Sequence, residues 1–133
     1  MIRAWRDNAT ELENRHIPKE VVPSDFVRVL RTRDPGNSYG VLKKIMDRCS
    51  GGFESVSESQ IYEGLRLFYK SEYFRNLYSR EGVLVGLEPA TVLAGVVKAV
   101  RTGMIKKDSK VLLNLSGAAK HGDVKISWIE DLL

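Results

Sequence analysis

The hydrophobic positions of the chain alternate between short strand-like runs and longer stretches with helical spacing. Residues 26–30 and 53–56 are runs rich in aromatic and β-branched residues, and residues 111–113 form a third run that is wholly apolar. Runs of this kind, bounded by turn residues, predict strands. Apolar residues at three- and four-residue intervals lie between them and predict helices. Strands that alternate with helices favour a parallel sheet, because parallel strands need long crossover connections.

We expect the fold to be organised around residues 82–117. This stretch predicts a short strand, a turn with Glu88 and Pro89, a helix to about Val100, a basic loop and an apolar strand. Pro89 suits the first turn of a helix, where its missing N–H would have no partner. The helix is apolar or small on every side, which predicts that it is buried. The polar residues at 114–117 end the last strand, where open α/β sheets bind ligands.

These patterns predict one domain over residues 1–133. It consists of an irregular first segment at residues 1–24 and an α/β core at residues 25–133. We expect the core to have three layers, with a mainly parallel sheet of about four strands flanked by helices. A chain of 133 residues is long enough to bury a core of its own.

A helix is predicted to begin with Asn37 or Ser38 as its N-cap and to end at Gly51 in the left-handed conformation. Its apolar residues lie at helical spacing on one face, which we expect to be buried. That face consists of Val41, Leu42, Ile45, Met46 and Cys49. The position of Cys49 on this face favours core packing over thiol chemistry.

A further helix is predicted to begin after Ser57, which forms a capping box with Gln60. The apolar stripe of this helix runs to about Lys70. Residues 71–80 also carry apolar and aromatic side chains, and they either prolong the helix or form a second one.

The composition is 43% hydrophobic and 29% charged, with a net charge of +4 and a pI near 9.3. Basic residues are interleaved with acidic ones along the chain, which argues against a nucleic-acid interface. The longest apolar stretch, residues 90–100, is shorter than the ~20 residues of a membrane span. The single cysteine, Cys49, excludes an internal disulfide framework. We therefore expect a cytoplasmic protein without membrane association.

Motifs that mark common active sites are missing from the sequence. It contains no glycine-rich phosphate loop, no paired-histidine zinc motif and no paired cysteines. His16 and His121 lie far apart, without an obvious nucleophile. Glu88 is explained as an acid favoured by the helix macrodipole, and Ser116 as a residue that satisfies the backbone at a strand end. Residue chemistry alone supports an α/β domain with no assigned catalytic residue and no metal site.

Two motifs nevertheless resemble a known signature. They are G-L-E-P-A-T at residues 86–91 and V-L-L-N-L-S-G at residues 111–117, separated by the small-residue helix and the basic loop. Together they resemble the C-terminal part of fold-type II pyridoxal-phosphate enzymes, and more narrowly the threonine synthase group. The archaeal cysteate synthase branch is nearest, because V-L-R-T-R-D-P at residues 29–35 also has a close analogue there. The resemblance extends from residue 26 to about residue 120.

The resemblance implies a cofactor-binding role for four residues. Ser116 matches the hydroxyl residue that hydrogen-bonds the pyridine nitrogen of pyridoxal phosphate, where a neutral partner tunes the ring as an electron sink. Asn114, Gly117 and Glu88 would line or support the same pocket. The sequence departs from the group's pattern at residues 118–121, where a further glycine is usual.

The resemblance also implies that the chain needs a complement. The enzymes of this group hold the cofactor on a lysine in an N-terminal motif and bind its phosphate with a glycine-rich loop, and neither motif is present. We therefore expect the C-terminal portion of a lyase or synthase of amino-acid biosynthesis, inactive alone. Its partner would be the N-terminal half of such an enzyme or another copy in a homo-oligomer. The alternative is a non-catalytic α/β interaction or regulatory domain derived from that family.

Overall fold

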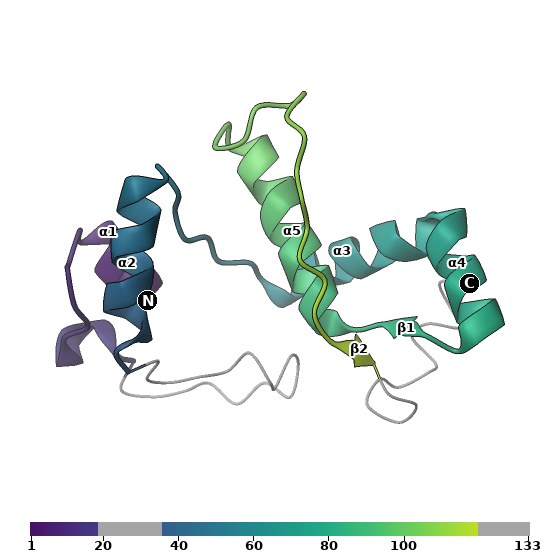
Figure 1. Ribbon diagram of the computed structural model, residues 1–133, viewed down its shortest axis with the longest axis horizontal. Helices are drawn as coiled ribbons and strands as arrows, with labels where there is room; N and C mark the ends of the chain where they lie inside the picture. Colours follow the sequence, from purple (N-terminus) through teal and green to yellow (C-terminus); the bar gives the residue numbers. More distant parts are fainter. Residues whose placement is uncertain (19–35, 120–133) are drawn as a thin grey trace. The chain divides into compact units, whose positions relative to one another are not determined.

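The computed structural model describes residues 1–18 and 36–119 (Figure 1). The chain divides into two compact units, Met1–Ser55 and Val56–Leu133, and each is described by itself. The single domain expected over residues 1–133 stays a prediction. The strand expected at residues 26–30 lies outside the described residues.

The described part of the first unit contains α1 (Ile2–Arg6), the 3-10 turn η1 (Asn14–His16) and α2 (Ser38–Arg48). Its core is aromatic. The Trp5 and Phe53 rings meet edge to face, with their centroids 5.2 Å apart. Tyr39 is fully buried, and its hydroxyl donates a hydrogen bond to the Ala9 carbonyl oxygen at 2.9 Å. Aromatic rings carry a large apolar area, which suits them to form the core of so small a unit.

α2 buries a different face from the predicted one. Lys43 is only 6% exposed, because its ammonium lies 5.0 Å from the Trp5 ring centroid and 2.6 Å from an Asp47 carboxylate oxygen. Val41 is 60% exposed, and Cys49 is exposed as well, so the expected core position of this thiol is wrong. The long stem of Lys43 reaches the Trp5 ring, and the Tyr39 ring lies beside Phe53 with the centroids 6.1 Å apart, so this face rather than the predicted one meets the aromatic core.

The end of α2 also differs from the prediction. The helix ends at Arg48, and Ser50 rather than Gly51 takes the left-handed conformation, with φ at 51°. Residues 53–56 form no strand, so that prediction is wrong too.

The described part of the second unit contains α3 (Glu58–Lys70), α4 (Glu72–Glu81), β1 (Leu84–Val85), α5 (Leu87–Arg101) and β2 (Ala118–Ala119). The predicted capping box is confirmed. The Ser57 hydroxyl accepts from the Gln60 N–H at 3.3 Å, and the Gln60 side-chain oxygen accepts from the Ser57 N–H at 2.8 Å. Residues 71–80 belong to a separate helix, α4. It ends at Gly82, which is left-handed with φ at 64°.

α3 and α5 cross closely at a glycine. A Cβ atom built on Gly64 would lie 2.5 Å from the carbonyl oxygen of Ala90, so only glycine fits at this point. Ala90 and Ala94 are buried, and so are Leu65 and Phe68 of α3. The crossing therefore joins the small side of α5 to the apolar side of α3 (Figure 1).

The predicted α/β architecture is wrong for the described residues. Helices dominate, and a two-stranded antiparallel sheet pairs Leu84 with Ala119 and Val85 with Ala118. The expected strand at residues 111–113 has no ladder. A mainly parallel sheet of about four strands needs neighbouring strand edges, and the described residues supply only these two short strands.

The expectation that α5 is buried on every side is also wrong. Ala90, Ala94 and Ala99 are buried, but Val92 on another side is 38% exposed, and the space around Gly95 is open within 4 Å of its built Cβ. The described residues therefore leave part of the apolar surface of this helix uncovered.

The Gly64 crossing gives a direct test of packing. We expect Gly64→Ala to destabilise the second unit by about 1–3 kcal/mol, because the added methyl group overlaps the Ala90 carbonyl oxygen. Gly95→Ala is the matched control: it adds a methyl group to α5 in open space and should be neutral or stabilising by up to about 1 kcal/mol. Urea unfolding followed by circular dichroism measures both, and equal effects would contradict the close crossing.

Candidate cofactor-facing site

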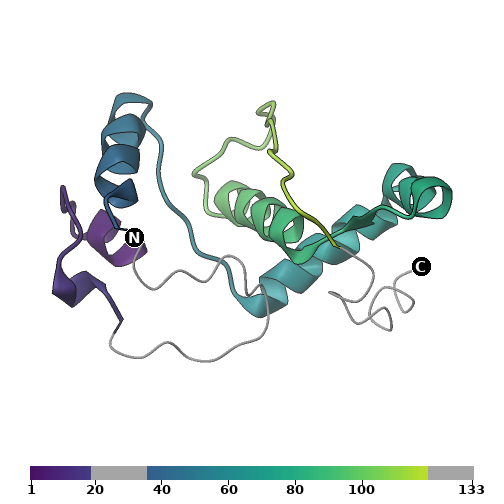
Figure 2. The ribbon, with the colours of Figure 1, turned by 60° about the horizontal axis from the view of Figure 1, so that its bottom comes forward.

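The structure brings Glu88 and Gly117 together. Glu88 lies in the first turn of α5, directly after β1, and Gly117 directly precedes β2. After α5 the chain returns to the start of the same helix, where β2 pairs with β1 (Figures 1 and 2). A Cβ on Gly117 would lie 3.4 Å from Oε2 and 3.5 Å from Cβ of Glu88. With φ at 90°, Gly117 also has a backbone that glycine favours.

Ser116 and Asn114 lie on the same returning segment, and both are exposed. Within the described residues, the Ser116 hydroxyl makes no hydrogen bond. The Glu88 carboxylate is half-buried and has no hydrogen-bond or ion-pair partner among the described residues. An open hydroxyl can both donate and accept a hydrogen bond. The site therefore offers a hydroxyl and a carboxylate without partners among the described residues, next to Gly117, which has no side chain.

A tyrosine that the sequence did not single out fastens β1 to α3. The Tyr69 hydroxyl accepts from the Val85 N–H at 3.2 Å and donates to the Val85 carbonyl oxygen at 3.4 Å. In an antiparallel pair successive residues alternate in the direction of their hydrogen bonds, so these Val85 groups point away from β2. No local pattern of the sequence indicates that Tyr69 binds a strand sixteen residues later.

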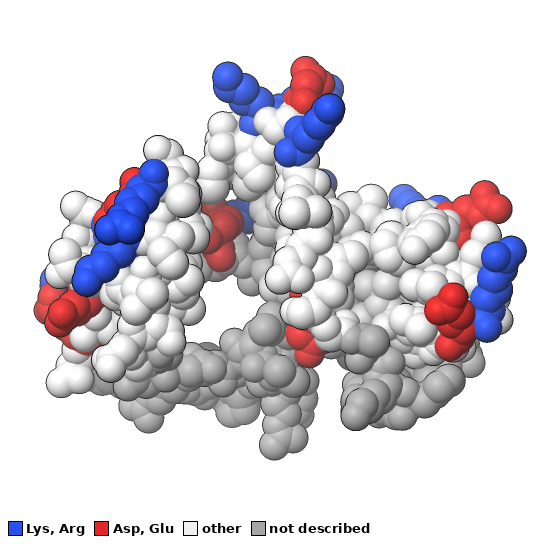
Figure 3. Space-filling view, in the orientation of Figure 1, with Lys and Arg blue, Asp and Glu red and all other residues white. Residues whose placement is uncertain are grey.

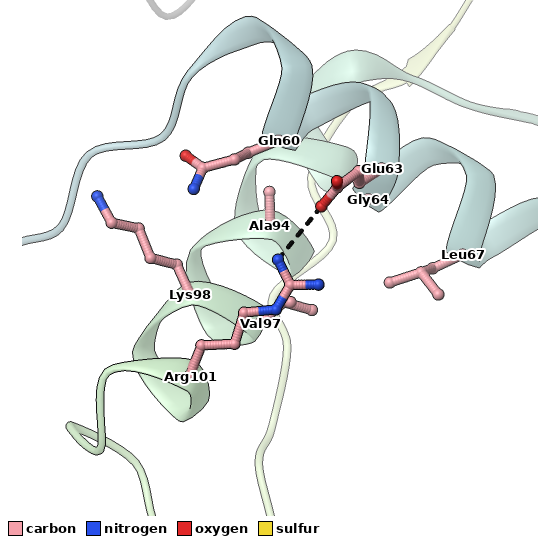
Figure 4. Close-up of a pocket in the computed structure, with 8 residues that line it drawn as sticks. All are labelled: Gln60, Glu63, Gly64, Leu67, Ala94, Val97, Lys98 and Arg101. Carbon is pink, nitrogen blue, oxygen red and sulfur yellow. Dashed lines mark hydrogen bonds and ion pairs between the residues drawn. The ribbon is translucent and has the colours of Figure 1, made fainter.

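The pocket between α3 and α5 is too small to be a binding site (Figure 4). Its volume of about 10 Å³ holds roughly one water molecule. Gly64 and Ala94 form its floor, and an ion pair between Arg101 and Glu63, with N and O 3.4 Å apart, crosses its rim. Both side chains are more than half exposed, so the pair adds little stability.

His16, the histidine within the described residues, has a structural setting. It is 3% exposed, its Nδ1 accepts from the Glu13 N–H at 3.0 Å, and its Nε2 lies 3.3 Å from an Asp7 carboxylate oxygen. Both ring nitrogens thus face groups of the first unit. His121 lies outside the described residues. Residues 1–18 and 36–119 contain no group of three or more side chains suited to hold a metal ion.

Charged side chains of both signs lie together on the surface of the second unit (Figure 3). The loop after α5 gathers exposed lysines at positions 106, 107 and 110 around Asp108. No helix in the described parts of the chain is long and apolar enough to cross a membrane.

Comparisons with known proteins confirm the predicted resemblance to cysteate synthases. The chain is 30% identical over 126 residues to the cysteate synthase of Methanospirillum hungatei, an alignment that covers 88% of this chain and 26% of that protein. It is 28% identical over 127 residues to the cysteate synthase of Methanosarcina barkeri, covering 88% and 27%. The chain thus spans about a quarter of the length of these curated relatives. No family model matches, and no solved structure matches.

Tyr69→Phe tests the fastening of β1. We expect it to cost about 1–3 kcal/mol at neutral pH, because the buried N–H and carbonyl of Val85 lose their partner. Tyr73→Phe is the control, since Tyr73 is 68% exposed. Denaturant unfolding measures both variants, and a Tyr69 variant as stable as the control would contradict the bond.

The same tyrosine predicts an alkaline effect. Burial raises the pKa of the Tyr69 phenol, partly offset by its hydrogen bond with Val85. A raised folded pKa means that the stabilisation is complete below the titration of an unfolded tyrosine, at about pH 10, and is lost as the pH rises through the folded value. The fall in unfolding free energy above about pH 10 should therefore be smaller in Tyr69→Phe than in the unaltered chain. An identical fall would show that Tyr69 does not contribute.

Gly117→Ala tests the contact between the two predicted site segments. Gly117 and Gly103 both have positive φ, at 90° and 76°, but a Cβ on Gly103 would meet nothing within 4 Å. Both alanine variants should lose about 1–2 kcal/mol from backbone strain. Gly117→Ala should lose slightly less, because its methyl group comes into ordinary van der Waals contact with Glu88, and Glu88→Ala should remove most of this difference. A double-mutant cycle in urea measures this coupling, and zero coupling would contradict the contact.

Proposed function

We propose that this chain is the C-terminal portion of a cysteate synthase-like pyridoxal-phosphate enzyme. The observation that supports it is the identity of 30% over 126 residues with a cysteate synthase, in an alignment that covers 88% of this chain. The remainder of such an enzyme would supply the lysine that holds the cofactor and the loop that binds its phosphate. The chain acts only with that remainder.

Ser116 is the residue that we assign to the cofactor. Its hydroxyl is exposed and has no partner among the described residues, as a group reserved for a ligand requires. Gly117 carries no side chain beside it and lies against Glu88, so the backbone there is open to close approach. Pyridoxal phosphate, when bound, supplies an electron sink. The part of Ser116 is to hold the pyridine nitrogen by a hydrogen bond, with Asn114 and Glu88 as supporting residues.

The proposal is tested in a chimera: the Methanospirillum hungatei cysteate synthase with the matched segment replaced by this chain. We expect the chimera to bind pyridoxal phosphate, with the visible absorption of the bound cofactor. Ser116→Ala should lower turnover by about ten- to a hundredfold, the effect of losing one hydrogen bond to a charged or polarised group. Ser116→Thr keeps the hydroxyl and should retain most of the activity.

Ser109→Ala is the matched control, because Ser109 is exposed in the loop after α5. It should leave absorption and turnover unchanged. A chimera that folds but shows no cofactor absorption, or a Ser116→Ala variant that behaves like Ser109→Ala, would contradict the assignment. Either result would favour a non-catalytic interaction domain.

A further inference from the structure

The Tyr69 hydroxyl takes the place of a neighbouring strand beside β1. In an extended chain the N–H and C=O of one residue point to the same side, where a paired strand normally binds both. β2 pairs with one edge of β1. On the other edge the Tyr69 oxygen binds the Val85 N–H at 3.2 Å and the Val85 carbonyl oxygen at 3.4 Å. A strand of two residues is thus held on both edges.

The chemistry of the phenol suits it to this place. A hydroxyl can make both hydrogen bonds through one atom, because it donates and accepts. Tyr69 is 1% exposed, so water cannot readily replace it. Burial raises the pKa of its phenol, so at neutral pH the hydroxyl keeps the proton that it donates to the Val85 carbonyl oxygen. Removal of the oxygen would leave two buried backbone groups unpaired, which folded chains avoid by a shift of the backbone.

Two short routes lead from Val85 to Ser116. Along the chain, Glu88 follows in the first turn of α5 and lies against Gly117, whose built Cβ would be 3.4 Å from the Glu88 Oε2. Across the sheet, Val85 pairs with Ala118, which is close to Ser116 along the chain. Both routes end at residues that follow Ser116 directly. A displacement of β1 therefore moves Ser116 as well.

We propose that Tyr69 is a positioning residue for the cofactor: through β1 it sets where Ser116 presents its hydroxyl. The role of Ser116 in this statement rests on the proposed function. A hydrogen bond weakens steeply when its distance and angle depart from the preferred values, and a misplacement of about 1 Å can lower a rate by about a hundredfold. Loss of the Tyr69 oxygen therefore weakens the bond that Ser116 makes, although it removes no group from the site.

The isolated chain tests the route from Tyr69 to Ser116 without the cofactor. In Tyr69→Phe we expect the backbone amide signals of Ser116 and Gly117 to shift in a two-dimensional NMR spectrum. Gly103→Ala is the control, because Gly103 has φ at 76° and open space around its built Cβ, at the opposite end of α5 from Glu88. Backbone strain destabilises this variant, but both amide signals should stay in place. Unchanged signals in Tyr69→Phe would overturn the proposal.

The chimera with the Methanospirillum hungatei cysteate synthase tests the consequence for the cofactor. We expect Tyr69→Phe to raise the Kd of pyridoxal phosphate, measured by absorption titration, and to lower turnover, each by about tenfold. The effect must act through Ser116. In a chimera that already carries Ser116→Ala, Tyr69→Phe should therefore change Kd and turnover by less than about twofold. Equal effects in both backgrounds would show a merely structural tyrosine.

The outcomes separate this proposal from the proposed function. Shifted amide signals in the chain, together with a chimera without cofactor absorption, would support the route from Tyr69 to Ser116 and contradict the function. A chimera impaired by Ser116→Ala, in which Tyr69→Phe behaves like Gly103→Ala, would support the function and overturn the positioning. Equal losses in Tyr69→Phe and Gly103→Ala would show that turnover follows stability, and would overturn the positioning as well.

A second substitution keeps the test decisive if Tyr69→Phe does not fold. 4-Aminophenylalanine at position 69 retains the ring and a donor to the Val85 carbonyl oxygen, but its amine accepts from the Val85 N–H only weakly. It should shift the Ser116 and Gly117 signals and lower turnover by less than about tenfold, again only while Ser116 is present. Unshifted signals with unchanged turnover would overturn the proposal.

Discussion

The described part of the second unit depends on one close contact, the crossing of α3 and α5 at Gly64. The side chains at a contact set the distance between two helices, and here the Ala90 carbonyl oxygen occupies the space where any other residue would place its Cβ. The buried residues of α3 lie on the same side of the helix as Gly64: Ile61, Leu65 and Phe68. A close approach of the backbones is therefore what allows α3 to bury its apolar side.

The crossing also positions the candidate site. α3 holds the chain before α5 through the Tyr69 hydroxyl, which binds both backbone groups of Val85. It holds α5 itself through Gly64. Glu88, in the first turn of α5, is thus placed by two independent contacts with one helix. The return of the chain to β1 then brings Gly117 against it.

The site that results is built by two kinds of contact. Glu88 and Gly117 are placed by packing and by the short sheet, both of which this chain supplies. Ser116 and Asn114 are exposed on a segment that the described residues leave unpaired. A hydroxyl that must hold a cofactor needs a fixed position, since small displacements cost large factors in rate. The proposed complement of the chain would therefore supply rigidity as well as the missing cofactor-binding groups.

The sequence by itself determined the features that depend on neighbours within a few positions. The capping box at Ser57, the place of Pro89 in the first turn of α5 and the relationship to cysteate synthases all followed from local patterns. The tertiary structure decided the rest. Helical spacing located α2, but packing against Trp5 decided that Lys43 rather than Val41 is buried. An apolar run predicts a strand only if a partner edge exists, and for residues 111–113 the start of α5 removes that edge, because a helical backbone has no hydrogen bonds to offer a ladder.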